Sequence, residues 1–273
     1  MSKTTKSFIA KIFGSSRSSL YYQHKLPNKD EILKNQILAI IANNPAYGYR
    51  RVALALKIGT RSVRRVMKRF SIRPTKRRVH LRKRRDERNP PALYPNYIKS
   101  FCPITPGNVY VGDFTYIKHK NQYIYLATYM DLFTREIVGW SISNKHTKFL
   151  VLDALLSAFE TTGYKLPKFI HTDQGSEYNC KQYLNFVKYL NISVSMIKKA
   201  SPWENGYQES FFSNFKTDLG IEFDRFDSIG ELVEGIHQQI NYHNNIRIHT
   251  ALKMSPSQFR QKYYQTHTSE CQS

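Results

Sequence analysis

The 273-residue sequence has no run of 18 or more apolar residues, and its first 22 residues lack the apolar stretch and cleavage site of a secretory signal. Cysteine is also scarce, since Cys102, Cys180 and Cys271 are far apart and form no Cys-x-x-Cys pair. These absences argue against a membrane-spanning or secreted protein, a disulfide framework and a zinc site. We therefore expect a cytoplasmic protein with one sizeable core and a smaller module.

Acidic residues are nearly absent from the first 100 positions. Residues 1–100 hold 25 Lys and Arg against 4 Asp and Glu, whereas residues 101–273 hold 17 against 16, so the net charge of +22 is almost entirely N-terminal. Such a density is typical of a surface that displaces counterions from nucleic acid. A solvated charged face and an anionic membrane are the alternatives, but the segment lacks the continuous apolar face that enters a membrane interface.

The N-terminal third is predicted to be helical. Apolar spacing predicts one helix from Asn28 to Asn43, a second from Arg50 to Lys57 and, after a turn at Gly59, a third capped by Thr60. The third helix is apolar on one face and basic on the other, where it carries Arg61, Arg64, Arg65, Lys68 and Arg69. This pattern favours a helix-turn-helix module whose basic residues contact double-stranded DNA, although helical hairpins with a basic face are also common.

Composition sets the expected boundaries around this module. Residues 1–27 form a basic segment, 28–74 the helix-turn-helix module and 75–100 a basic linker without apolar periodicity. The linker is rich in arginine, including Arg77, Arg82 and Arg85, and is expected to follow DNA phosphates.

From residue 108 the apolar period changes from helical to alternating. The pattern predicts strands over 109–117, 122–130 and 136–142, a helix over 147–160, a strand over 168–172, a helix over 180–190, a strand over 192–197 and helices over 203–219 and 228–244. A meander followed by helix-strand alternation predicts an α/β fold with a mixed five-stranded sheet flanked by helices. We assign this core, with its C-terminal helices, to residues 101–262 and a tail to 263–273.

Three acidic residues lie at unusual places in this pattern. Asp113 falls inside the first strand, where aspartate is depleted, and Asp173 directly follows the fourth strand, at the edge where α/β sheets bind ligands. Glu209 lies in the middle of a predicted helix among aromatic residues, with 35 residues between it and Asp173. Taken singly, each has an ordinary explanation: a solvent-facing aspartate, a turn aspartate or a solvated helix glutamate.

The surrounding motifs resemble those of bacterial insertion-sequence transposases with a retroviral-integrase-type core, the catalytic reading-frame product of such elements. The matching segments are Gly112-Asp113-Phe114-Thr115-Tyr116, His171-Thr172-Asp173-Gln174-Gly175-Ser176-Glu177-Tyr178, Glu204-Asn205-Gly206-Tyr207-Gln208-Glu209-Ser210-Phe211-Phe212 and Asn241-Tyr242-His243-Asn244-Asn245-Ile246-Arg247-Ile248-His249. They occur in the family's order and with its 35-residue spacing, and the resemblance extends from about residue 18 to 260.

The resemblance implies a ribonuclease-H-like fold in which Asp113, Asp173 and Glu209 are the catalytic residues and hold two Mg²⁺ ions, with Mn²⁺ as a possible substitute. Carboxylate oxygens suit these hard ions, and a pair of them can activate an attacking oxygen and stabilise a leaving one. The implied activity is cleavage of DNA at the element ends, followed by transfer of the freed strand to target DNA.

Two further residues are expected near the DNA. Lys216 lies two helical turns beyond Glu209 on the same face, where its ammonium group can hold a phosphate. Asn205, one turn before Glu209, either reaches DNA or caps the helix. We leave His171, His243 and His249 out of the metal set because histidines near strand or helix ends are mostly structural, and Asp131 is expected to be structural too.

The resemblance also implies partners: the element ends, a target duplex, further copies of the chain on DNA and the product of an overlapping upstream reading frame. Two other functions remain open. One is a nuclease of the same fold that does not join strands, and the other is a non-catalytic DNA-binding regulator derived from a transposase.

Overall fold

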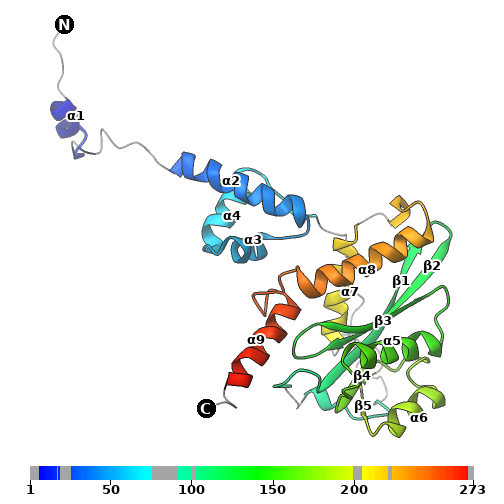
Figure 1. The fold of residues 1–273 in the computed structure, drawn as a ribbon. Helices are drawn as coiled ribbons and strands as arrows, with labels where there is room; N and C mark the ends of the chain where they lie inside the picture. Colours follow the sequence, from blue (N-terminus) through cyan, green and yellow to red (C-terminus); the bar gives the residue numbers. More distant parts are fainter. Residues whose placement is uncertain are drawn as a thin grey trace. The chain divides into compact units, whose positions relative to one another are not determined.

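The computed structural model describes residues 6–16, 18, 26–75, 92–99, 103–198, 205–220 and 223–269 (Figure 1). The chain divides into two compact units, residues 1–74 and 75–273. Most of the predicted basic linker, including Arg77, Arg82 and Arg85, lies outside the described residues, as do Cys102 and Cys271.

The N-terminal unit contains a cluster of three helices, α2 (Leu26–Asn43), α3 (Tyr49–Leu56) and α4 (Thr60–Arg69), which follow α1 (Lys6–Ile12) in the sequence. Ile37, Val52 and Val63, one from each of the three helices, are fully buried. The three predicted helices are therefore present, and their apolar faces form the core of this unit.

The turn between α3 and α4 differs from the prediction in two details. Thr60 is the first helical residue, and the N-cap is Gly59, so no side chain caps α4. The residue that takes the left-handed conformation is Lys57, with φ of 55°, and its N–H donates to the Leu54 carbonyl. The chain thus reverses directly after α3, and Gly59 has an extended backbone that other residues could adopt.

Five strands of the second unit form one mixed sheet in the order β3-β2-β1-β4-β5. They are β1 (Val109–His119), β2 (Gln122–Asp131), β3 (Ile137–Ser143), β4 (Phe169–Thr172) and β5 (Ser193–Met196). The first three pair antiparallel, and β4 and β5 extend the sheet in parallel from β1. The mixed five-stranded sheet predicted from the sequence is confirmed.

One face of the sheet is covered by α5 (Lys148–Thr161) and α6 (Lys181–Tyr189) (Figure 1). Leu150, Leu155 and Tyr183 from these helices are buried there. A Cβ atom on Gly139 of β3 would overlap the backbone of α5, so glycine is needed for the close approach of this helix to the sheet.

The other face is covered by α7 (Gly206–Asp218) and α8 (Ile229–Asn245), whose aromatic and aliphatic residues pack against Ile117 and Leu126 of the sheet. The short helices η2 (Tyr97–Lys99) and η4 (Phe223–Arg225) precede β1 and α8 in the sequence. The last helix, α9 (Pro256–Ser269), continues past residue 262 into the segment expected to be a tail. Within the described ranges, no helix combines the length and apolar character needed to cross a bilayer.

Candidate active site

Two of the three acids predicted to act together lie next to each other in the sheet. Strands β1 and β4 pair in parallel as far as Val111 and His171, and Asp113 and Asp173 follow two residues further along each segment. Strand β4 ends at Thr172, whereas β1 continues to His119. Both carboxylates therefore lie at the carboxyl end of β4, where α/β sheets bind ligands.

The environment of Asp113 strongly favours its neutral form. Burial, followed by the negative charge of Asp173, raises the pKa of Asp113 to about 7, and the charge of Glu209 adds to the rise. The Phe114 N–H, 2.8 Å from Asp113 Oδ1, opposes the shift by donating to the carboxylate. Burial is thus the main cause of the raised pKa, and the charges of two acids from other elements add to it.

Asp173 shares this environment. Burial raises its pKa, the Gly175 N–H at 2.9 Å opposes the rise, and the charge of Glu177 adds to it. In the part of the chain that the structure describes, no Lys or Arg forms an ion pair with Asp113 or Asp173. Among these residues, the two carboxylates therefore have no cationic side chain to balance their charge.

Glu209 lies in the first turn of α7, not in the middle of a helix as predicted, because the described helix begins at Gly206 after its N-cap Asn205. Its side chain is half-buried, and its negative charge contributes to the raised pKa of Asp113. Among the described residues, no three Asp, Glu, His or Cys side chains are placed close enough together to bind one metal ion. Asp113 and Asp173 thus form an adjacent pair, with Glu209 nearby on a different element.

Gln208 ties the start of α7 to the sheet beneath the acids. Its side chain is fully buried, its amide nitrogen donates to the carbonyls of Val111 and Thr128, and its amide oxygen accepts from the Thr128 hydroxyl at 3.1 Å. Thr128 is the β2 residue paired with Asp113. The sequence analysis did not predict a role for Gln208. Its hydrogen-bond partners are 80 or more residues away, and the local pattern of an aromatic helix contains no information about them.

Lys216 and Asn205 have different surroundings. Lys216 Nζ donates to the Tyr116 carbonyl at 2.7 Å and lies 5.1 Å from the centre of the Tyr116 ring, along the part of β1 beyond its pairing with β4. Asn205 is 2% exposed, makes no side-chain cap, and both polar atoms of its amide lack a hydrogen-bond partner. The capping role considered for Asn205 is therefore wrong.

Glu177 is a fourth acid that the sequence interpretation did not assign. It is 8% exposed and accepts hydrogen bonds from the Ser176 hydroxyl at 2.9 Å and from His146, whose Nδ1 is 3.0 Å away. Burial alone would raise its pKa, but the hydrogen bond from His146 holds the pKa below its ordinary value. Glu177 is thus ionised beside Asp173 and contributes to the negative potential.

The histidines excluded from the metal set have structural contacts. His171 Nδ1 is 2.9 Å from the Ser195 hydroxyl, and His243 Nε2 is 3.0 Å from the Arg135 carbonyl. His249 pairs with Met254 through an isolated bridge of the backbone.

The basic residues of α4 divide into two sets. Arg65 and Arg69 both bind the carboxylate of Asp30 in α2, at 2.5 and 2.8 Å. Although burial would raise it, the hydrogen bonds from these two arginines hold the pKa of Asp30 below its ordinary value. The other set, Arg61, Arg64 and Lys68, is exposed to solvent. Arg65 and Arg69 therefore join α4 to α2, a contact that the local sequence pattern did not reveal.

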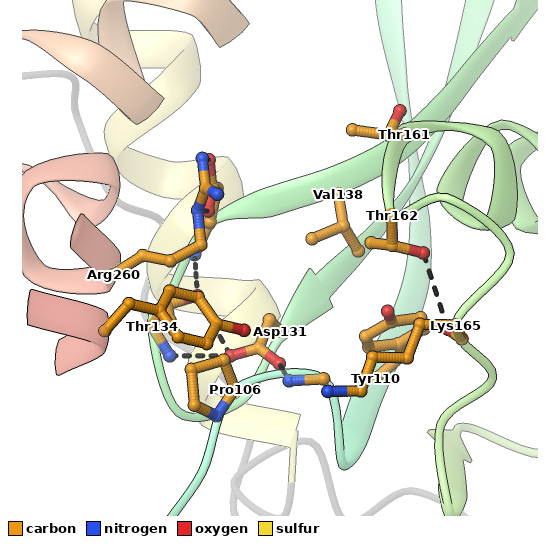
Figure 2. Close-up of a pocket in the computed structure, with 12 residues that line it drawn as sticks. Pro106, Tyr110, Asp131, Thr134, Val138, Thr161, Thr162, Lys165 and Arg260 are labelled. Atoms are coloured by element: carbon orange, nitrogen blue, oxygen red, sulfur yellow. Dashed lines mark hydrogen bonds and ion pairs between the residues drawn. The ribbon is translucent and has the colours of Figure 1, made fainter. Parts of the chain in front are cut away.

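The charged groups around a cavity of about 200 Å³ near the start of β1 have structural contacts (Figure 2). At this cavity Asp131 is buried and accepts hydrogen bonds from the backbone of Gly107, Phe133 and Thr134. Arg260 and Glu136 form an ion pair at 2.7 Å. These charged groups bind one another or the backbone, so the structural role predicted for Asp131 is confirmed.

Comparison with known proteins shows the family to which the chain belongs. Two family models, each described as an integrase core domain, match residues 104–202 and 209–264. The chain is 30% identical over 259 residues to a protein named as a transposase, InsK of insertion sequence element IS150 in Escherichia coli (strain K12), covering 91% of this chain and 90% of the relative. It is also 30% identical over 271 residues to an uncharacterized 31 kDa protein of insertion element IS600 from Shigella sonnei, covering 94% and 99%.

A solved structure shows the same fold. A chain of the simian T-cell lymphotropic virus intasome, determined in complex with PP2A regulatory subunit B56 gamma, superimposes with a TM-score of 0.51 at 16% identity. The match covers 82% of this chain and 74% of the other. The second unit accordingly has the ribonuclease-H-like fold of integrase cores.

Proposed function

We propose that this chain, which belongs to the IS3 family of insertion-sequence transposases with an integrase core domain, cleaves phosphodiester bonds at the ends of its element and transfers the freed strand to target DNA. The observation that carries the proposal is the parallel register of β1 and β4, which places Asp113 and Asp173 side by side at the carboxyl end of β4, with the charge of Glu209 from α7 acting on Asp113. Perturbed carboxylates grouped at a strand end are typical of a catalytic site.

The acid group fits divalent metal ions. Its donors are carboxylate oxygens, which suit Mg²⁺ and Mn²⁺, and no cationic side chain among the described residues is ion-paired with Asp113 or Asp173. Asp113, Asp173 and Glu209 would hold two ions, which when bound polarise the attacking oxygen and stabilise the leaving one.

The protein's own residues position these acids and the DNA. Gln208 fixes the start of α7 on β1 and β2, so a change of side-chain rotamer at Glu209 can bring its carboxylate toward the aspartate pair. Lys216 lies further along the same helix beside β1 and presents positive charge to a phosphate backbone. We keep the DNA contact expected for Asn205 as part of the proposal: its amide has no hydrogen-bond partner among the described residues, but it is buried, so DNA would have to uncover it.

The substrate that fits the charge distribution is double-stranded DNA, as element ends and as target. The exposed basic residues of α4 would contact its phosphates from the N-terminal unit. We propose that the active form is a multimer of this chain on DNA, and that the product of an upstream overlapping frame takes part in recognition of the ends. In this proposal, residues 28–74 form the DNA-binding module, 75–100 a basic linker and 101–262 the catalytic core, between a basic segment over 1–27 and a tail over 263–273.

The proposal is tested by incubating purified protein with labelled candidate ends, a target duplex and Mg²⁺, with and without the upstream frame product. We expect cleavage followed by joined products. Asp113→Ala, Asp173→Ala and Glu209→Ala should each abolish both steps while DNA binding survives. Asp153→Ala, which removes an exposed aspartate on α5, serves as the matched control and should be active.

The outcomes separate the alternatives. Cleavage without joined product would indicate a nuclease, and DNA binding without either reaction in any metal would indicate a regulator. Full activity in any of the three acid variants would refute the assignment of that residue.

A further inference from the structure

A second cavity, of about 380 Å³, lies beside α7 and the end of α8. Its lining includes Arg135, Tyr207, Ser210, His243, Arg247 and His249. At 3.6 residues per turn, Tyr207 projects about 160° away from Glu209 around the helix axis. The cavity is therefore separate from the acid group, although the same helix turn contributes to both. Its volume falls in the usual range for ligand sites, about 300–1,000 Å³.

The cavity has basic side chains in its lining. The described residues that line it include two arginines and two histidines and no acidic residue. The charge of Arg247 is balanced inside the fold, because its guanidinium binds Asp218 and the Asn214 side chain. Arg135 is different: among the described residues it forms no ion pair, and its Nη1 is buried without a hydrogen-bond acceptor. Because a buried donor without an acceptor is unfavourable, Arg135 requires an acceptor that a ligand can supply.

Arg135 and Tyr207 also form a flat stacking surface. The Arg135 guanidinium lies 4.0 Å from the centre of the Tyr207 ring. Tyr207 is 43% exposed, so a large part of an aromatic side chain faces solvent at this site. Aromatic rings and guanidinium planes are the surfaces on which proteins stack unpaired bases.

We infer that this cavity binds one unpaired nucleotide of bound DNA, with its base stacked at Tyr207 and Arg135 and with Arg135 donating to its phosphate or base. A simple anion could accept a hydrogen bond from Arg135 but would not stack on the Tyr207 ring. Bases inside a duplex are stacked on one another, so their faces are not available to this ring. The inference rests on the proposed function, because the nucleotide comes from DNA held by this chain. Because Tyr207 and Glu209 lie on the same helix, a nucleotide bound in the cavity would help to position the helix that carries Glu209.

The test measures the affinity of the full chain for three duplexes of equal paired length, in EDTA so that no cleavage occurs. One duplex is blunt, one has a three-nucleotide extension with 2-aminopurine at its centre, and one has an abasic extension with the same phosphates. We expect the base-bearing extension to bind about tenfold more tightly than the abasic one, with quenching of 2-aminopurine by stacking. Tyr207→Ser should remove this advantage and the quenching, and Tyr207→Phe should keep both.

The control is Tyr189→Ser, which removes a tyrosine that is 84% exposed on α6 and should leave all three affinities unchanged. The inference is overturned if wild-type protein binds the base-bearing and abasic extensions equally, or if Tyr207→Ser weakens all three duplexes alike. Either result would leave the proposed function standing, provided that the blunt duplex still binds. Failure of the wild-type chain to bind any duplex would instead refute the proposed function as well.

Discussion

At the scale of single residues, Asp113 links pH to stability. Its folded-state pKa of about 7 lies above the ordinary value of 3.8, so between pH 4 and 7 the native state retains a proton that the unfolded chain releases. Without metal, stability therefore falls as pH rises through this window. Asp113→Asn cannot ionise but keeps an acceptor for the Phe114 N–H. We expect its Tm to exceed that of wild type by roughly 5 °C at pH 8 in EDTA.

Calorimetry at two pH values checks this expectation. At pH 4, close to the ordinary value of 3.8, only a small part of this pH-dependent difference has developed, so the two proteins should unfold within about 1 °C of each other. An equal difference in Tm at pH 4 and pH 8 would show that the substitution acts by another route.

The same carboxyl group predicts the pH dependence of metal binding. An ion must displace the proton of Asp113, so the apparent affinity for Mn²⁺ should rise about tenfold per pH unit below about 7 and level off above it. Titration followed by electron paramagnetic resonance measures this directly. A flat profile from pH 5 to 8 would mean that Asp113 is not a ligand.

Gln208 gives a prediction for positioning. Gln208→Leu leaves the Val111 carbonyl and the Thr128 hydroxyl without their buried partner, which should cost about 1–3 kcal/mol of stability. Because Glu209 is the next residue, strand transfer should fall by about 10–100-fold, with little loss of DNA binding. Gln238→Leu, an exposed position on α8, is the matched control. Unchanged transfer in a folded Gln208→Leu protein would remove the positioning role.

At the scale of elements, the two sets of basic residues on α4 should behave differently. Replacing Arg61, Arg64 and Lys68 by Gln should lower the salt dependence of duplex binding by about 0.9 per lost phosphate contact, with no change in Tm. Asp30→Asn should instead lower the Tm of the N-terminal unit, because Arg65 and Arg69 lose their shared partner. An unchanged salt slope in the triple variant would place the DNA contact elsewhere.

The elements also show what local patterns can reveal. Strands β1 to β5 were predictable because apolar alternation reports burial on a sheet, and Asp113 and Asp173 stood out because strand interiors and strand ends rarely carry acids without a reason. The first turn of α7 was predicted less well, because the helix was expected from residue 203 and Glu209 was therefore placed in its middle. The bonds from Gln208 to the sheet and from Asp30 to α4 join distant segments, so no local pattern contains them.

At the scale of the whole molecule, the two units should separate two functions. The N-terminal unit has its own buried core and belongs to the basic third of the chain, while the acids lie in the second unit. A fragment of residues 75–273 should be folded, as judged by circular dichroism, and should bind Mn²⁺ as tightly as the full chain does. It should bind duplex DNA at least about tenfold more weakly than the full chain at 150 mM salt. Equal duplex affinity for fragment and full chain would show that the second unit alone provides the DNA surface.

The central claim is that three carboxylates from different elements hold paired metal ions against DNA. Its most direct test is an anomalous-scattering measurement on crystals of the full chain bound to an element end and Mn²⁺. The account predicts two peaks, both bound by oxygen atoms from the group Asp113, Asp173 and Glu209, with Glu209 turned toward the aspartates. Ordered DNA at the site with Mn²⁺ bound elsewhere, or with Mn²⁺ that Glu209 does not bind, would contradict it.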